Sequence, residues 1–144
     1  AWSSDVCSSD LKSHKTDIAQ ALKFLSGTQK KKAIVFVISD FMAEDYEHTL
    51  KIAAKKHDIT GIRVYDIREE KIPDLGMVSM LDAETGQIQL VNTGSKSVRM
   101  NYEKQYHNKV NYFKETFSKS GSGVVNTRVD ESYVTKLLSY FKSR

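Results

Sequence analysis

Apolar positions in the first half of the chain recur with alternating helix and strand periods. Beginning near residue 16, one helix face is indicated by the spacing of Ile18, Ala21, Leu22 and Leu25. Residues 33–38 form an uninterrupted apolar run, rich in β-branched side chains, that predicts a strand covered on both faces in a parallel sheet. A helix over residues 43–57 and a second strand over residues 61–67 follow.

The second half of the chain predicts a hairpin, a long helix and a final strand and helix. Two short strand-like runs, residues 77–81 and 87–91, flank a loop of glycine and small polar residues. The helix expected over residues 97–119 carries an apolar stripe of Tyr106, Val110, Phe113 and Phe117. After a strand over residues 124–129, Asp130 is expected to cap a helix that buries Val134, Leu137, Leu138 and Phe141.

Strands that alternate with helices imply a parallel sheet with right-handed crossovers. The strand over residues 33–38 has the most buried pattern, yet no strand precedes it in the sequence. The pattern therefore predicts half of a sheet, with an open strand edge that offers unpaired backbone groups to other chains. We expect the isolated chain to aggregate through this edge.

The first eleven residues share no apolar periodicity with the rest of the chain. They repeat Ser-Ser-Asp twice and look like a translated sequencing adapter. Such a segment buries too little surface to offset the entropy lost when its backbone becomes ordered. Residues 1–11 are therefore interpreted as an artefactual or disordered tail, and residues 12–144 as the folded part.

Composition limits the class of protein. The chain has 144 residues and a formal net charge of +4, which becomes +6 when Asp5 and Asp10 of the tail are set aside. No apolar run approaches the roughly 20 residues of a membrane helix, so one domain without a membrane segment is expected, in the cytoplasm. Cys7 is the one cysteine and lies in the tail, which excludes disulfides and thiolate zinc sites from the rest.

The basic excess permits an anionic partner, and the long helix offers one way to bind it. Tyrosines and lysines interleave along this helix at Tyr102, Lys104, Tyr106, Lys109, Tyr112 and Lys114. Aromatic rings beside basic groups can bind single-stranded nucleic acid, so a basic nucleic-acid-binding domain is the alternative function. It is ranked second because an aromatic stripe on a helix more often packs in the core.

Two short motifs carry a resemblance to a known fold. Residues 15–18 (Lys-Thr-Asp-Ile) open a helix, and residues 36–41 (Phe-Val-Ile-Ser-Asp-Phe) end a buried strand. Together they resemble the von Willebrand factor A fold, in which a metal-ion-dependent adhesion site lies at the carboxyl edge of the sheet. That site combines an Asp-x-Ser-x-Ser loop, a threonine before a helix and an aspartate after a central strand. By this resemblance Thr16 and Asp40 are metal ligands, and Ser39 is a supporting hydroxyl.

A third stretch narrows the resemblance. Residues 72–86 are similar to a characteristic segment of one bacterial branch of that fold, the domain-of-unknown-function family number fifty-eight. Its members are often encoded beside MoxR-type AAA+ ATPases. The resemblance covers residues 12–144 as the C-terminal half of a von Willebrand factor A-like domain. It implies an α/β fold with a partial, doubly wound parallel sheet, an inserted β-hairpin and no N-terminal half. The implied function is a non-enzymatic protein-interaction module that works with such an ATPase.

The implied metal site is incomplete in this chain. Magnesium prefers six oxygen ligands and keeps several waters, so a hydroxyl and one carboxylate can contribute to its binding. The Asp-x-Ser-x-Ser element is absent from Lys12 onward. We therefore expect Mg²⁺ in the full-length protein and no cofactor in this chain alone. The alternative roles are a helix N-cap for Thr16 and a turn residue for Asp40.

Other kinds of site find little support in the sequence. The four histidines show no His-x-x-x-His or His-Cys spacing, so a zinc site is not expected. No nucleophile elbow, phosphate-binding loop or catalytic pair is recognisable. We therefore expect a protein that is not an enzyme.

Overall fold

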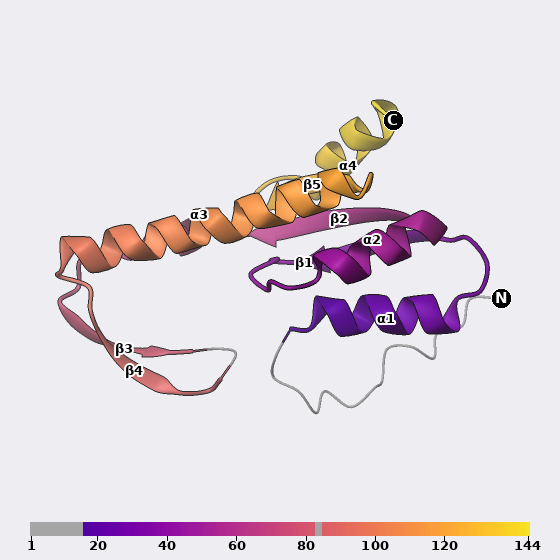
Figure 1. The fold of residues 1–144 in the computed structure, drawn as a ribbon. Coiled ribbons are helices and arrows are strands. Elements are labelled where there is room, and N and C mark those ends of the chain that lie inside the picture. The colour runs from indigo at the N-terminus through magenta and orange to yellow at the C-terminus, as the bar shows by residue number, and fades with distance from the viewer. Residues whose placement is uncertain (1–15, 83–84) are drawn as a thin grey trace.

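The computed structural model describes residues 16–82 and 85–144, so the interpretation of residues 1–11 as a tail lies outside the described residues. Figure 1 shows helices and strands of a mixed α/β fold, as the periodicity predicts. In chain order they are α1 (Ile18–Thr28), β1 (Ile34–Ser39), α2 (Glu47–Lys56), β2 (Asp58–Tyr65), the 3-10 helix η1 (Ile67–Glu69), β3 (Met77–Leu81), β4 (Ile88–Asn92), α3 (Lys96–Lys119), β5 (Gly123–Arg128) and α4 (Tyr133–Lys142).

Three parallel strands form the sheet in the order β1-β2-β5, with β2 in the centre. Across its carboxyl half, Ser39, Arg63 and Asn126 lie side by side. The predicted hairpin is also present, since β3 and β4 pair in antiparallel fashion with Met77 opposite Asn92. It lies away from the parallel sheet, beside the beginning of α3 (Figure 1).

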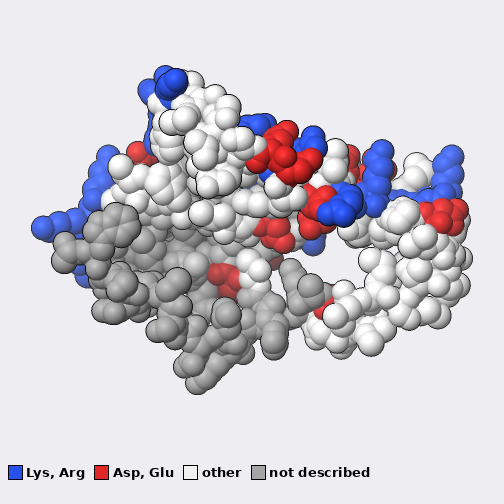
Figure 2. Space-filling model, turned by 180° about the vertical axis from the view of Figure 1, so that it is seen from behind, with Lys and Arg blue, Asp and Glu red and all other residues white. Residues whose placement is uncertain are grey.

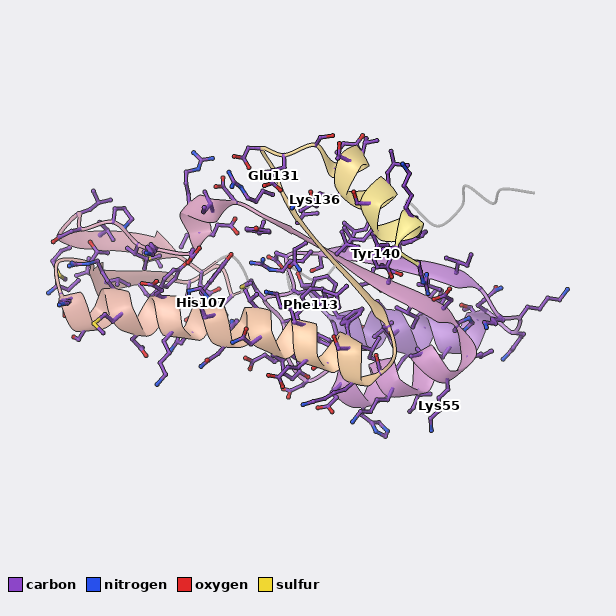
Figure 3. All side chains as sticks on the ribbon, turned by 90° about the horizontal axis from the view of Figure 1, so that it is seen from above. Lys55, His107, Phe113, Glu131, Lys136 and Tyr140 are labelled. Atoms are coloured by element: carbon purple, nitrogen blue, oxygen red, sulfur yellow. The ribbon has the colours of Figure 1, made fainter. Side chains whose placement is uncertain are left out.

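Helices cover both faces of this sheet. Side chains of successive strand residues point to opposite faces. Gly61 of β2 lies against Phe113 and Phe117 of α3, whereas the hydroxyl of Thr60 lies 3.3 Å from that of Tyr140 in α4. Figure 3 shows Phe113 and Tyr140 on opposite sides of the strands.

The hydrophobic core lies between the sheet and helices α1, α2 and α3. The predicted stripe on α3 is buried at all four positions. Facing it are buried residues of the other elements: Ile18, Leu22, Phe41, Tyr46, Leu50, Ala53 and Ile59. Two details of the helix predictions are wrong. Ala21 is exposed, and the N-cap position of α4 is Ser132 rather than Asp130, whose carboxylate pairs with Arg128.

The prediction that β1 is covered on both faces is wrong. Alternate residues Ile34 and Ile38 are 68% and 67% exposed, because β1 is an edge strand and α4 lies mainly over β5. Phe36 meets α4 through an edge-on contact with Phe141, at 5.8 Å between ring centroids. The expected burial of α4 residues is wrong for the same reason, since Val134 and Leu138 are about half exposed. Seen from behind, much of the surface over α4 is white in Figure 2.

The exposed apolar side of β1 leads to a prediction about self-association. We expect Ile38→Lys to remain monomeric at protein concentrations where the wild-type chain associates, since a charge on an edge strand disfavours strand pairing between molecules. The cost in stability should be small because Ile38 is 67% exposed. Sedimentation velocity over a concentration series measures the effect. Ile52→Lys, the same change at an exposed position of α2, should associate like the wild type. A wild-type chain that stays monomeric throughout would contradict the prediction.

Candidate ligand site at the carboxyl edge of the sheet

The loop between β1 and α2 has a constrained backbone. Phe41 and Asp45 have φ angles of 57° and 63°, in the left-handed region that residues other than glycine rarely adopt. Phe41 is nonetheless fully buried, and its ring stacks on Phe113 with 4.0 Å between centroids. This packing anchors the loop, and α2 begins at Glu47 rather than at the predicted residue 43.

Asp40 directly follows β1, as the sequence predicts, and it stabilises the turn that leaves the strand. Its Oδ1 accepts hydrogen bonds from the Met42 backbone N–H at 3.2 Å and from the Ser39 hydroxyl at 3.3 Å. The Ser39 hydroxyl oxygen in turn accepts the Phe41 backbone N–H at 3.1 Å. Because both bonds to Asp40 use Oδ1, a ligand that binds Oδ2 would leave the turn intact.

Thr16 is not the cap of α1. The cap is Asp17, whose carboxylate accepts the Gln20 backbone N–H at 2.8 Å. Thr16 precedes the cap and is exposed. The N-cap interpretation of Thr16 is therefore wrong, and its hydroxyl is not used to start the helix.

Thr16 and Asp40 line two adjoining hollows at this edge of the sheet. The first has a volume of about 460 Å³ and acidic lining residues Asp17, Glu44 and Asp45 beside Thr16. The second, of about 420 Å³, is lined by Asp40 together with Asp82, Tyr102, Gln105 and Tyr106. Met42 and Lys109 line both hollows. The structure thus brings Thr16 and Asp40 to one end of the sheet, but to different hollows.

Charge in the two hollows is mixed. Carboxylates outnumber the one lysine that the hollows share, so an excess of negative charge faces solvent here. Lys109 extends from α3 between the two groups of carboxylates and balances part of their charge. Beneath the loop, burial raises the pKa of Tyr46, and its hydroxyl therefore stays protonated at neutral pH. The site can accept positively charged groups on its carboxylates and one negatively charged group at Lys109.

Comparison with known proteins identifies the family. A family model described as "Protein of unknown function DUF58" matches residues 4–112. The chain belongs to the DUF58 family. This confirms the resemblance drawn from residues 72–86.

Relatives of this DUF58 chain occur in mycobacteria. An uncharacterized protein of Mycobacterium avium is 26% identical over 129 residues, which cover 89% of this chain and 76% of the relative. Uncharacterized proteins of Mycobacterium bovis and Mycobacterium tuberculosis are each 32% identical over 73 residues, or 50% of this chain and 23% of theirs. The matched segment therefore covers about a quarter of the length of these two relatives. No solved structure matches the chain.

The residues of the DUF58 chain fit magnesium only in part. Two oxygen ligands from separate hollows leave most of the six positions to water or to groups from elsewhere. In residues 16–82 and 85–144, one group of three His, Cys, Asp or Glu side chains lies close enough to share an ion, and it does not include Asp40. The assignment of Thr16, Asp40 and Ser39 to a metal site stays a prediction.

That group consists of Glu70, Glu103 and His107, and the sequence analysis missed it. The Nε2 atom of His107 lies 3.2 Å from an oxygen of Glu70 and 3.8 Å from one of Glu103. A Glu-x-x-x-His spacing on the predicted long helix was a signal for two of these residues. Glu70 could not be found from spacing, because only the fold brings the segment after β2 to α3.

The tyrosines of α3 are engaged within the protein. Arg63 is 3% exposed, and its guanidinium donates a hydrogen bond to the Tyr106 hydroxyl. The Tyr102 hydroxyl donates to the Glu69 carbonyl at 2.9 Å, and Tyr112 packs edge-on against Tyr46. The hydroxyl groups of Tyr102 and Tyr106 and the ring of Tyr112 are therefore engaged within the protein.

Among the described residues, no helix is both long enough and apolar enough to cross a membrane.

Proposed function

We propose that this DUF58 chain is a non-enzymatic protein-interaction module of von Willebrand factor A type that binds its partner at the carboxyl edge of the parallel sheet. The observation that supports it most is the pair of adjoining hollows after β1, with Thr16 at one and Asp40 at the other. Open α/β sheets commonly bind ligands outside the carboxyl ends of their strands. The ring of Phe41, fully buried against Phe113, anchors the loop at this edge.

The chemistry of the hollows suggests what the partner presents. A partner with lysine or arginine side chains could pair with Asp17, Glu44 or Asp45, which are solvent-exposed. A partner carboxylate could pair with Lys109. In the full-length protein, Thr16 and Asp40 would help to hold Mg²⁺, which would supply positive charge for an acidic partner group. Ser39 would orient Asp40 through the hydrogen bond between their side chains.

The partner proposed is a MoxR-type AAA+ ATPase, and this part rests on the family resemblance alone. Nucleic acid is the second candidate because of the net charge of +4. The burial of Tyr106 and the packing of Tyr112 against Tyr46 favour the protein partner, since stacking on bases would require rings that are free. Positive and negative side chains are also interspersed on the face seen in Figure 2.

The test is a binding titration between this chain and the purified MoxR-type ATPase encoded in the same genome. We expect Asp40→Ala to weaken binding about tenfold, the loss typical of one charge-assisted contact, about 1.4 kcal/mol. With the full-length protein, in which Mg²⁺ is expected, chelation of Mg²⁺ should weaken wild-type binding and leave the binding of Asp40→Ala unchanged. The matched control is Asp58→Ala, which removes a carboxylate at the amino end of β2, where Asp58 pairs with Arg144.

Each possible result bears on the proposal. Equal affinity of Asp40→Ala and wild type would place the interface elsewhere, and failure of the wild type to bind would exclude the ATPase as partner. A parallel titration with a single-stranded oligonucleotide tests the alternative. Tight binding there that falls steeply with salt would favour the nucleic-acid function instead.

A further inference from the structure

We infer that Glu70, Glu103 and His107 form a binding site for a divalent transition-metal ion such as Zn²⁺. Glu103 and His107 are one turn apart on α3, and Glu70 follows η1. The site therefore joins two segments that are distant in sequence. None of its residues lines the two hollows at the carboxyl edge of the sheet.

The distances between the ligand atoms suit a zinc ion. One ligand atom from each side chain lies within 4.8 Å of the other two. Zinc bonds of about 2.0–2.2 Å that meet at the tetrahedral angle place neighbouring ligand atoms about 3.3–3.6 Å apart. The Nε2 atom of His107 lies 3.2 Å from Glu70 Oε1 and 3.8 Å from Glu103 Oε1, on either side of that range. Small changes of side-chain torsion are enough to admit the ion.

The ligand types select the metal. One imidazole nitrogen and two carboxylate oxygens suit zinc and its transition-metal neighbours, whereas Mg²⁺ and Ca²⁺ prefer oxygen ligands alone. Two carboxylates and a neutral imidazole carry a charge of −2, which a divalent ion neutralises. Three protein ligands leave a fourth position for water.

The backbone around the three ligands is held in place by other contacts. The Tyr102 hydroxyl donates to the Glu69 carbonyl at 2.9 Å, which ties the residue before Glu103 to the residue before Glu70. The Asp66 carboxylate accepts the Arg68 backbone N–H at 2.9 Å and caps η1. Hydrogen bonds from Arg68 hold the pKa of Asp66 at about 2, so this cap stays ionised near neutral pH. Ligands fixed in this way lose little conformational entropy when an ion binds.

Lys71 places a positive charge close to the proposed metal site. Its ammonium group lies 3.6 Å from Glu103 Oε1, and its side chain is 69% exposed. An arriving ion can therefore displace it into solvent at little cost. The ligands themselves are partly exposed, with the His107 side chain 49% accessible, so the ion has an open path. Figure 3 shows His107 near the middle of α3.

Calorimetric titration of the whole chain with Zn²⁺ tests the inference. Cys7 and His14, which lie outside the described residues, could bind zinc themselves, so a Cys7→Ser and His14→Gln background is used throughout. We expect one ion per chain and at least a tenfold loss of affinity in His107→Ala and in Glu103→Gln. His48→Ala, which removes an exposed histidine of α2, should bind zinc as the background chain does.

A further variant separates metal binding from a loss of folding. Lys71→Met should raise the zinc affinity several-fold, because it removes a competing cation without removing a ligand. Absence of zinc binding, or His107→Ala affinity equal to that of the background chain, would overturn the inference. The zinc inference is tested independently of the ATPase titration, because Asp40→Ala should leave zinc binding unchanged.

Discussion

Replacing Phe41 with alanine is expected to lower the free energy of unfolding by about 3–5 kcal/mol, the range for truncating a buried aromatic residue. The Phe41 ring is fully buried, stacks on Phe113 and meets Phe117 edge-on at 5.3 Å between centroids. Its removal leaves a cavity lined by aromatic rings that cannot collapse easily. Urea denaturation followed by circular dichroism measures the loss. Phe36→Ala, at a position 46% exposed, should cost clearly less.

The same substitution should also disturb the candidate site. Phe41 has a left-handed backbone conformation that its buried side chain stabilises, so alanine keeps the backbone strain and loses the compensating contacts. The neighbouring Asp40 would then lose its fixed position, and binding at the hollows should weaken even where the variant remains folded. A Phe41→Ala chain as stable as the Phe36→Ala control would show that the stacked rings contribute little.

Gly61→Ala is expected to lower the free energy of unfolding by about 1–3 kcal/mol, the usual cost of overpacking a core. A Cβ atom at Gly61 would lie 2.6 Å from Phe117 Cε1 and 2.7 Å from Phe113 Cε2, closer than carbon atoms approach without displacement. Because β2 is the central strand and both rings belong to α3, the helix or the rings would have to move away from the sheet.

The control is Gly27→Ala. Gly27 lies inside α1, and no atom within 4 Å opposes an added Cβ. Alanine favours a helix by about 1 kcal/mol over glycine, so this variant should be slightly more stable. Equal thermal unfolding of the two variants would contradict the close approach at Gly61. Gly27 does not end the helix, since α1 continues to Thr28 and its C-cap is Gln29.

Long periodic segments were predicted well from the sequence. The spacing that predicted α3 over residues 97–119 and the hairpin over residues 77–91 agrees with the structure within about one residue at the element ends. The environment of β1 could not be predicted, since an apolar run indicates two buried faces whether or not a neighbouring strand exists to cover them. The exposure of α4 was missed for a similar reason, because an amphipathic pattern does not tell how much of its apolar side the fold covers.

The residues of the candidate site could be predicted only where their positions follow from neighbouring residues in the sequence. The position of Asp40 directly after β1 was predicted correctly, because a polar residue after a buried strand lies at the carboxyl end of the sheet, whereas its role as a ligand stays a prediction. The participation of Lys109 could not be foreseen, since only the path of α3 brings it between Thr16 and Asp40. The left-handed conformations of Phe41 and Asp45 also had no signal, because glycine and asparagine are the residues that usually indicate them.

Helix α3 belongs to two parts of the molecule at once. Its 24 residues span about 36 Å, from the hairpin at one end to the aromatic core at the other. A helix of this length behaves as a nearly stiff rod. If the hairpin tilts the first turns of α3, the helix pivots near its middle, and Phe113 and Phe117 at its other end move in the opposite direction. The hairpin is thus mechanically linked to the stacked ring of Phe41, and contacts made there could change the shape of the hollows without touching them.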